Sequence, residues 1–438
     1  MRLKMTWLGL ALAAAFGTAT PAWAQSLQEM YEAARAYDAA YLAARAQAAS
    51  AEFRVAQSEA LLRPSAALTA GATAQQQDLP RVGSGDTNTL QSAVQGRLPL
   101  FNKANEATVA QARKSLGVAK ADLETAEQDL IVRVAQAYFD VLASQDSLAT
   151  VRANKTAVTE TLASAKRNFE VGTATITDTR EAQARFDLVT AQEIAAENDL
   201  LTKRIALDQL VGRSNQQPKP LAVPVVLPAV VPNNVEEWVT RADQSHPTVQ
   251  RARTGLEVAQ LETEKARAGE KPTVDAVGSV GLARLSGSSA TLPGLSKTAS
   301  IGVQLNWPLY TGGATQNAIS EKRLLEDKAR NDLEAARRGV AQGTRVAFFG
   351  VNSLQAQVKA LEAAESSNKL ALEAAQLAYR VGVRVNLDVL NAQTQLFQTQ
   401  RDLAKARYDV IVNSLRLRQA SGQLTAGDLE AANRLLQR

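Results

Sequence analysis

The chain has 438 residues, a formal net charge of +5, one histidine and no cysteine. Without cysteine it can form no disulfide, thiolate metal site, cysteine nucleophile or lipid-modified N-terminal cysteine. Acidic and basic residues alternate along the chain, which is typical of solvated helix faces and not of a nucleic-acid-binding surface. We therefore expect no cofactor, no metal and no nucleic-acid partner. The single histidine, His246, precedes Pro247 and is predicted to be a loop residue.

Residues 1–24 have the pattern of a secretory signal peptide. Arg2 and Lys4 form a basic start, and the apolar stretch Trp7–Phe16 is too short to span a bilayer. The small residues around Trp23 form a cleavage site, so the mature chain would begin at Gln25. Because no later segment has enough consecutive apolar residues for a transmembrane helix, any membrane span of this exported chain must consist of strands.

Proline divides the remaining chain. No proline lies between Pro99 and Pro218 or after Pro308, whereas five fall within Pro218–Pro232. Proline interrupts helices, so the two proline-free stretches permit very long ones. Near-heptad spacing of apolar residues in the first stretch indicates coiled-coil packing. We predict helices at 27–62, 104–171, 178–210, 236–269, 314–381 and 388–420.

Two segments alternate polar and apolar residues and predict β-hairpins, at about 65–98 and 273–307. In the first hairpin, the Gly-, Asp- and Pro-rich segment 76–88 is predicted to be a loop. The segment Ala299–Trp307 has the clearest alternation in the chain.

The two halves align at an offset of 208 to 210 residues. Leu98-Pro99-Leu100-Phe101 matches Trp307-Pro308-Leu309-Tyr310, and Gly172 and Gly212 match Gly382 and Gly422. This pattern indicates a tandem duplication of one unit, comprising a helix, a hairpin, a long helix, a tip and a return helix. We expect structural repeats at 25–212 and 236–422, a Pro-rich linker at 213–235 in the equatorial region, and a C-terminal tail at 423–438.

The fold class is mostly α with β. Four strands with one apolar face fit a barrel that has lipid outside and water within. A bilayer does not accept open strand edges, and about eight strands are the minimum for a closed barrel, so the barrel must be shared between chains. The alternative is a small soluble sheet beneath the helices. The predicted signal peptide and the absence of cysteine favour the barrel.

The two tips, Val171–Asp178 and Val381–Asp388, each follow an aromatic residue and contain Val-Gly and a β-branched run that ends at Asp. Glycine can adopt a positive φ and end a helix. We expect Asp178 and Asp388 to N-cap the return helices.

These motifs resemble those of the TolC family of outer-membrane efflux channels. The resemblance covers nearly all of residues 25–432 and rests on five segments: 137–142, the two tips with their flanks, 307–313, and 406–408. It implies a homotrimer with a twelve-stranded barrel, four strands per chain, continued by a periplasmic α-helical coiled-coil barrel. It also implies a passive, non-enzymatic channel that binds a periplasmic adaptor and, through it, an inner-membrane RND or ABC transporter. The missing cysteine indicates the unlipidated type.

The resemblance also implies roles for residues of the tips. Asp178, Tyr379 and Arg384 match the residues that link neighbouring hairpins at the closed periplasmic gate. Asp388 matches the first of two aspartates that line the entrance, but Asn391 stands where the family has the second, which predicts weaker cation attraction. Without the resemblance, Tyr379 and Arg384 would be interpreted as surface turn residues. The adaptor-docking tips are Val171, Gly172, Thr173, Val381, Gly382 and Val383.

Two other classes of function compete with the exit duct of a tripartite efflux pump or type I secretion system. A periplasmic coiled-coil scaffold or adaptor without a pore would have similar helices, but it would not need two hairpins with lipid-facing patterns. A glycosidase or other carboxylate enzyme would need a pair of acidic residues that is distinct from the helix-surface background. The sequence contains no such pair and no catalytic motif.

Overall fold

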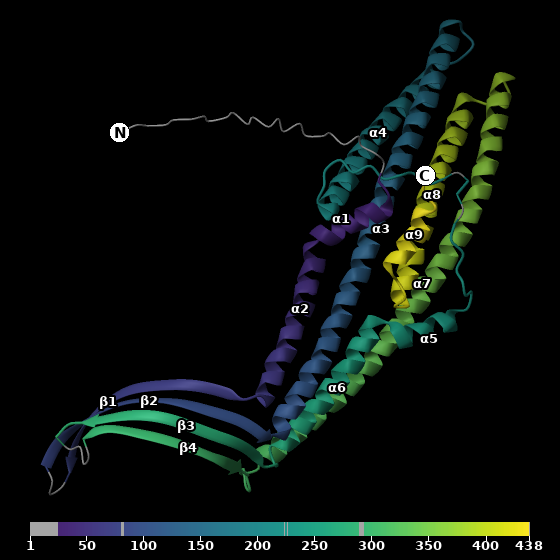
Figure 1. The fold of residues 1–438 in the computed structure, drawn as a ribbon. Helices are drawn as coiled ribbons and strands as arrows, with labels where there is room; N and C mark the ends of the chain where they lie inside the picture. The colour runs from purple at the N-terminus through teal and green to yellow at the C-terminus, as the bar shows by residue number, and fades with distance from the viewer. Residues whose placement is uncertain (1–24, 80–82, 223, 226, 289–292, 438) are drawn as a thin grey trace, which may run out of the picture.

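The computed structural model describes residues 25–79, 83–222, 224–225, 227–288 and 293–437. The predicted signal peptide, residues 1–24, lies outside the described residues. The molecule is elongated, with a β-sheet at one end and long helices that lead away from it (Figure 1). No helix of the described segments is both long and apolar enough to cross a membrane.

The sheet contains four antiparallel strands in the order of the chain: β1 (Ser65–Leu79), β2 (Gly83–Phe101), β3 (Thr273–Ser286) and β4 (Gly294–Asn306). Its central pairing, β2 with β3, joins the hairpin of the first half of the chain to that of the second. The four-strand sheet confirms the predicted number of strands.

The two faces of the sheet differ in polarity. On one face, Val94 pairs with Val280, and Ile301 is 93% exposed. On the other face, Gln95, Ser279 and Ser300 form one cross-strand row. Burial of apolar side chains is the usual rule in a single water-soluble chain, so the exposed apolar row needs a nonaqueous or protein partner.

The loop predicted at 76–88 is wrong over most of its length. Gln76 pairs with Asp86 and Asp78 with Ser84, so the hairpin continues as strand almost to its end. The ladder satisfies the backbone hydrogen-bonding groups of these polar residues, and this gain outweighs their low intrinsic strand propensity. Residues 80–82, at the end of the hairpin, lie outside the description.

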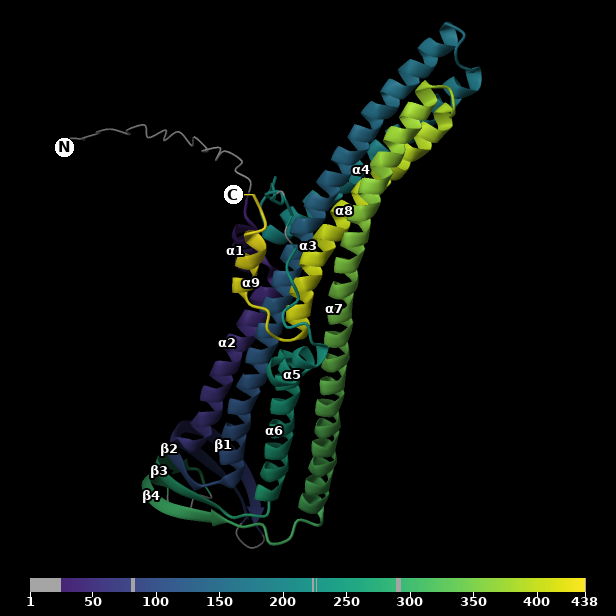
Figure 2. The same ribbon diagram turned by 90° about the vertical axis from the view of Figure 1, so that its right-hand side faces the viewer.

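Four helices run side by side from the sheet (Figure 2): α2 (Ala39–Glu59), α3 (Lys103–Glu170), α6 (Pro247–Ala268) and α7 (Ala314–Arg380). At 1.5 Å per residue, the 68 residues of α3 extend about 100 Å. The return helices are α4 (Ile176–Val211), which packs on α3, and α8 (Asn386–Ala420), which packs on α7. Both predicted long helices are therefore confirmed.

The predictions of continuous helices at 27–62 and 236–269 are wrong. The first consists of α1 (Leu27–Tyr37), α2 and the short 3₁₀ helix Ala60–Leu62, and the second of α5 (Val235–Ser245) and α6. The breaks occur at Asp38 and His246. Apolar periodicity alone does not show either break. Pro247, the first residue of α6, does mark the second one, because proline is favoured at the first helical position and disfavoured inside a helix.

His246 is more than a loop residue. Its Nδ1 accepts a hydrogen bond from the backbone N–H of Thr248 (3.1 Å), which makes it the N-cap of α6. Asp38 has the equivalent role in the first half, because its Oδ1 accepts from the N–H of Tyr41 (2.8 Å). Each cap satisfies a backbone donor that a helix start leaves unpaired.

The largest core lies midway along the helices, where α1, α3, α4 and α8 meet the C-terminal helix α9 (Ala426–Asn433). The Tyr138 hydroxyl, fully buried there, contacts the backbone oxygens of Gln25 and Lys219, each at 3.1 Å. Leu221 forms an isolated antiparallel bridge with Leu436. The start of the described chain, the Pro-rich segment and the C-terminal segment are thus fixed to the same level of the helices.

Candidate functional site at the helix tips

The two tips have the same backbone conformation. Gly172 and Gly382 have φ of +79° and +78°. In the first tip, the N–H of Gly172 donates to Phe169 O (3.0 Å) and that of Thr173 to Asn168 O (2.8 Å). The second tip repeats both bonds at 3.0 and 2.9 Å. These pairs form a Schellman motif, which satisfies the last carbonyls of a helix and requires a left-handed residue.

The return helices begin differently in the two tips, and the predicted N-caps Asp178 and Asp388 are both wrong. Thr175 is the N-cap of α4, and Asp178 lies three residues later, where it completes a capping box. The N-cap of α8 is Val385, which has no side-chain acceptor. An acidic residue at the third helical position favours the start of a helix in either case, through the capping box or the helix dipole.

Two of the three predicted gate residues, Asp178 and Arg384, form polar contacts within the protomer. One carboxylate oxygen of Asp178 accepts from the N–H of Thr175 (2.9 Å). Arg384 forms an ion pair with Asp388 (3.4 Å), one turn along the same chain segment. The protomer therefore does not bring Asp178 and Arg384 together, and a link between them stays a prediction about neighbouring chains.

The sequence did not indicate the contact of Asn391. Its Oδ1 accepts a hydrogen bond from Nη2 of Arg185, at 3.0 Å. Arg185 lies on α4 and Asn391 on α8, so this bond joins the two helical hairpins near their tips. The residues are 206 positions apart, and only the tertiary packing of α4 against α8 brings them into contact.

Apolar side chains at the tips are exposed to solvent. The exposed fractions are 74% for Val171, 66% for Val381 and 78% for Val383. Such a group at the end of two helical hairpins is a frequent mark of a protein-binding surface. The small glycines beside them have no other atom near the position that a Cβ would occupy, so the tips are also sterically accessible.

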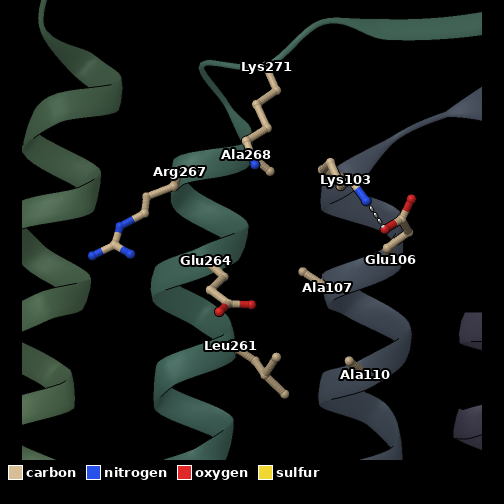
Figure 3. Close-up of a pocket in the computed structure, with 9 residues that line it drawn as sticks. All are labelled: Lys103, Glu106, Ala107, Ala110, Leu261, Glu264, Arg267, Ala268 and Lys271. Atoms are coloured by element: carbon tan, nitrogen blue, oxygen red, sulfur yellow. Dashed lines mark hydrogen bonds and ion pairs between the residues drawn. The ribbon is translucent and has the colours of Figure 1, made fainter.

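A cavity of about 510 Å³ lies at the opposite end of the helices, where α3 and α6 leave the sheet (Figure 3). Its floor contains Ala107 and Leu261, and its rim is charged. Lys103 at this rim pairs with Glu106 (2.6 Å). The described residues contain no group of three or more His, Asp or Glu side chains that could hold a metal ion.

Comparison with known proteins identifies the family. A sequence model described as "Outer membrane efflux protein" matches residues 30–213 and 238–423. The chain belongs to this family. The two matched regions correspond to the two halves of the chain and confirm the internal duplication, and the family match confirms the resemblance found in the sequence.

Individual relatives agree with this assignment. The outer membrane protein TolC of Vibrio cholerae is 34% identical over 430 residues, which cover 97% of each chain. The alkaline protease secretion protein AprF of Pseudomonas aeruginosa is 33% identical over 80% of this chain and 73% of its own. The crystal structure of VceC from Vibrio cholerae has a TM-score of 0.77 at 21% identity and covers 90% of this chain and 96% of its own. The last comparison concerns the fold alone.

The family assignment gives the long helices an orientation. The protein is an outer-membrane protein, with its sheet at the membrane and its helices in the periplasm. The tips are then the part farthest from the outer membrane, about 100 Å from the sheet by the length of α3.

Proposed function

We propose that the protein is the outer-membrane channel of a tripartite efflux pump or type I secretion system. In this proposal it acts as a homotrimer that conducts substrates passively from the periplasm to the outside, without catalytic activity. The observation that carries the proposal is the four-stranded sheet at one end of the long helices. In the described chain, its edge strands β1 and β4 each pair with one neighbour only.

Pairing with neighbouring chains would satisfy the open edges of β1 and β4. Strand β4 of one protomer would pair with β1 of the next, and three protomers would give twelve strands. The apolar row around Val280 and Ile301 would face lipid, and the polar row around Gln95 and Ser300 would face water. Arg97 and Asp275, which form an ion pair at 2.6 Å, extend the polar row inside the barrel.

The helices would continue the barrel as a periplasmic tunnel. The exposed valines of both tips support a docking role, with Val171, Gly172 and Thr173 in the first tip and Val381, Gly382 and Val383 in the second. We propose that a periplasmic adaptor protein binds there and connects the channel to an inner-membrane RND or ABC transporter.

The same tips would form the gate. Asp178 on one chain and Tyr379 and Arg384 on another would be linked in the closed trimer, since Arg is a multidentate donor and a Tyr hydroxyl can reach a carboxylate. Each of these groups keeps unused hydrogen-bonding capacity in the protomer, because a carboxylate accepts several bonds and a guanidinium donates five. Asp388 would add one carboxylate per chain at the entrance.

Conductance in planar bilayers tests this function. The purified, detergent-extracted protein should insert and produce discrete, uniform current steps, and cross-linking should yield trimers. A protein that remains soluble without detergent and conducts no current would instead be the periplasmic scaffold or adaptor considered above.

A further inference from the structure

We propose that Arg185, held by Asn391, is a specificity-determining residue that makes the tunnel entrance favourable to anionic solutes. This inference rests on the proposed channel function and adds the charge class of the preferred cargo. Its starting point is the hydrogen bond from Arg185 Nη2 to Asn391 Oδ1 (3.0 Å). The resemblance to the family implies no role for Arg185.

The chemistry of the acceptor matters more than the bond itself. An amide oxygen orients the guanidinium but carries no formal charge, so this partner leaves the positive charge of Arg185 uncompensated. An aspartate at position 391 would form an ion pair with the same guanidinium and cancel it. Asn391 thus does more than remove a carboxylate, because it also leaves an arginine charge exposed at the same place.

In contrast to the Arg185 charge, the entrance carboxylate Asp388 is compensated. Asp388 pairs with Arg384 at 3.4 Å, and both side chains remain partly exposed. Over residues 166–187 and 380–391, the two tips contain six Lys and Arg and five Asp and Glu. The balance is one positive charge per chain, and it would be zero with aspartate at position 391.

The position of the pair allows this charge to act on passing ions. Asn391 is exposed on α8 at the entrance position expected from the family, one turn beyond Asp388. In a trimer, three guanidinium groups would surround a narrow opening, where water is limited and fixed charge has its largest effect on ion selection. Charges farther along the helices are screened within about 8 Å at physiological salt.

The test is the chloride-to-potassium permeability ratio of the purified channel, measured from the reversal potential under a potassium chloride gradient. Wild type should favour chloride. Arg185→Gln and Asn391→Asp should each lower the ratio by roughly two- to fivefold, since each removes or cancels one exposed charge per chain. Arg185→Lys should keep the ratio, because it keeps the charge.

Arg204→Gln is the matched control, because it removes the same charge from α4 about 29 Å farther from the tip. It should leave the ratio unchanged. A conducting channel whose ratio is the same in wild type, Arg185→Gln and Asn391→Asp would overturn the proposal, as would an equal shift in the Arg204 variant. Absence of any conductance in wild type would overturn the channel function itself, and this proposal with it.

Discussion

The two halves of the chain have the same backbone design with different side chains at its critical positions. Asp38 and His246 cap the equivalent helices, and Thr175 and Val385 begin the equivalent return helices. Ala174 stands where the second half has Arg384. The duplication therefore preserved the turns, which depend on backbone conformation, while the polar groups diverged. We infer that the shared features determine shape and that the differing ones determine gating and selectivity.

The largest effect is expected at Gly422, where the turn after α8 packs against the backbone between α5 and α6. Gly422 has φ of +68°, and a Cβ there would overlap the backbone of His246. Gly422→Ala should lower the free energy of unfolding by about 2–5 kcal/mol, from left-handed strain and overpacking together. Thermal and denaturant unfolding in detergent measure this change.

Gly382→Ala is the control for this substitution, because its φ is similar and its surroundings are open. This substitution should lower the free energy of unfolding by about 1–2 kcal/mol, from left-handed backbone strain alone. Equal destabilisation by the two variants would show that packing against His246 contributes nothing. In the first half, Gly212 meets the ring of Tyr37 instead of backbone, and this half-exposed ring can move aside, so Gly212→Ala should resemble Gly382→Ala.

The second expected effect concerns the gate. Tyr379→Phe and Arg384→Ala give the second tip the residues of the first, Phe169 and Ala174. Each variant should raise single-channel conductance several-fold, because each removes a donor worth about 1 kcal/mol from the closed state. The reciprocal change, Phe169→Tyr in the first tip, should leave conductance unaltered. Unchanged conductance in both second-tip variants would contradict the gate assignment.

A smaller effect is expected from the helix caps. Thr175→Val gives the first tip the cap of the second and should cost about 1 kcal/mol of local stability. Val385→Thr should do the opposite and draw Asp388 toward the new cap, away from Arg384. Amide hydrogen exchange at residues 172–179 and 382–389 reports both changes. Equal exchange rates in the two wild-type tips would argue against a difference in capping.

The smallest effect is expected in the dependence of stability on pH. Burial lowers the pKa of His246 below its ordinary value. The folded protein therefore binds fewer protons than the unfolded chain just below pH 6.5, and stability is lost as pH falls from that value toward the folded pKa. In the first half, hydrogen bonding to Arg133 lowers the pKa of Asp38, so its contribution is lost only in more acidic solution.

His246→Asn isolates the contribution that protonation of His246 makes to the pH dependence of stability, because asparagine caps helices well and does not titrate. Between pH 7.5 and 5.5, the melting temperature of wild type should fall more than that of the variant. Parallel curves would mean that His246 has no role in the pH response.

The sequence predicted the features that arise from local rules repeated over long stretches. Absence of proline and heptad spacing predicted the two long helices, and alternation predicted the strands. Gly172 and Gly382 were identified as turn residues, and both have positive φ. The errors have two causes. At Gln76 the pairing of the strand ladder outweighs a local preference. At Asp38 and Thr175 the prediction missed a local cap, in which the side chain accepts a hydrogen bond from the backbone N–H three residues later, and Val385 begins its helix without a side-chain cap.

The contact between the two tips was beyond sequence reasoning because its partners lie 206 residues apart. Arg185 has no special pattern around it, and its relation to Asn391 depends on the packing of two hairpins from different halves of the chain. The ordered C-terminal helix α9, in the segment expected to be a tail, is a similar case. Leu429 of this helix and Leu436, which follows it, are buried only because the core of α1, α3 and α8 is present.

The sequence by itself determined the duplicated plan of the protein: an exported chain of two equivalent units, each with a hairpin, a long helix and a glycine turn. These features follow from backbone sterics and hydrophobic periodicity, which act between near neighbours. Only the tertiary structure decided which charges meet. It paired Arg384 with Asp388 and Arg185 with Asn391, because the position of a side chain near another helix depends on how that helix packs and not on spacing along the chain.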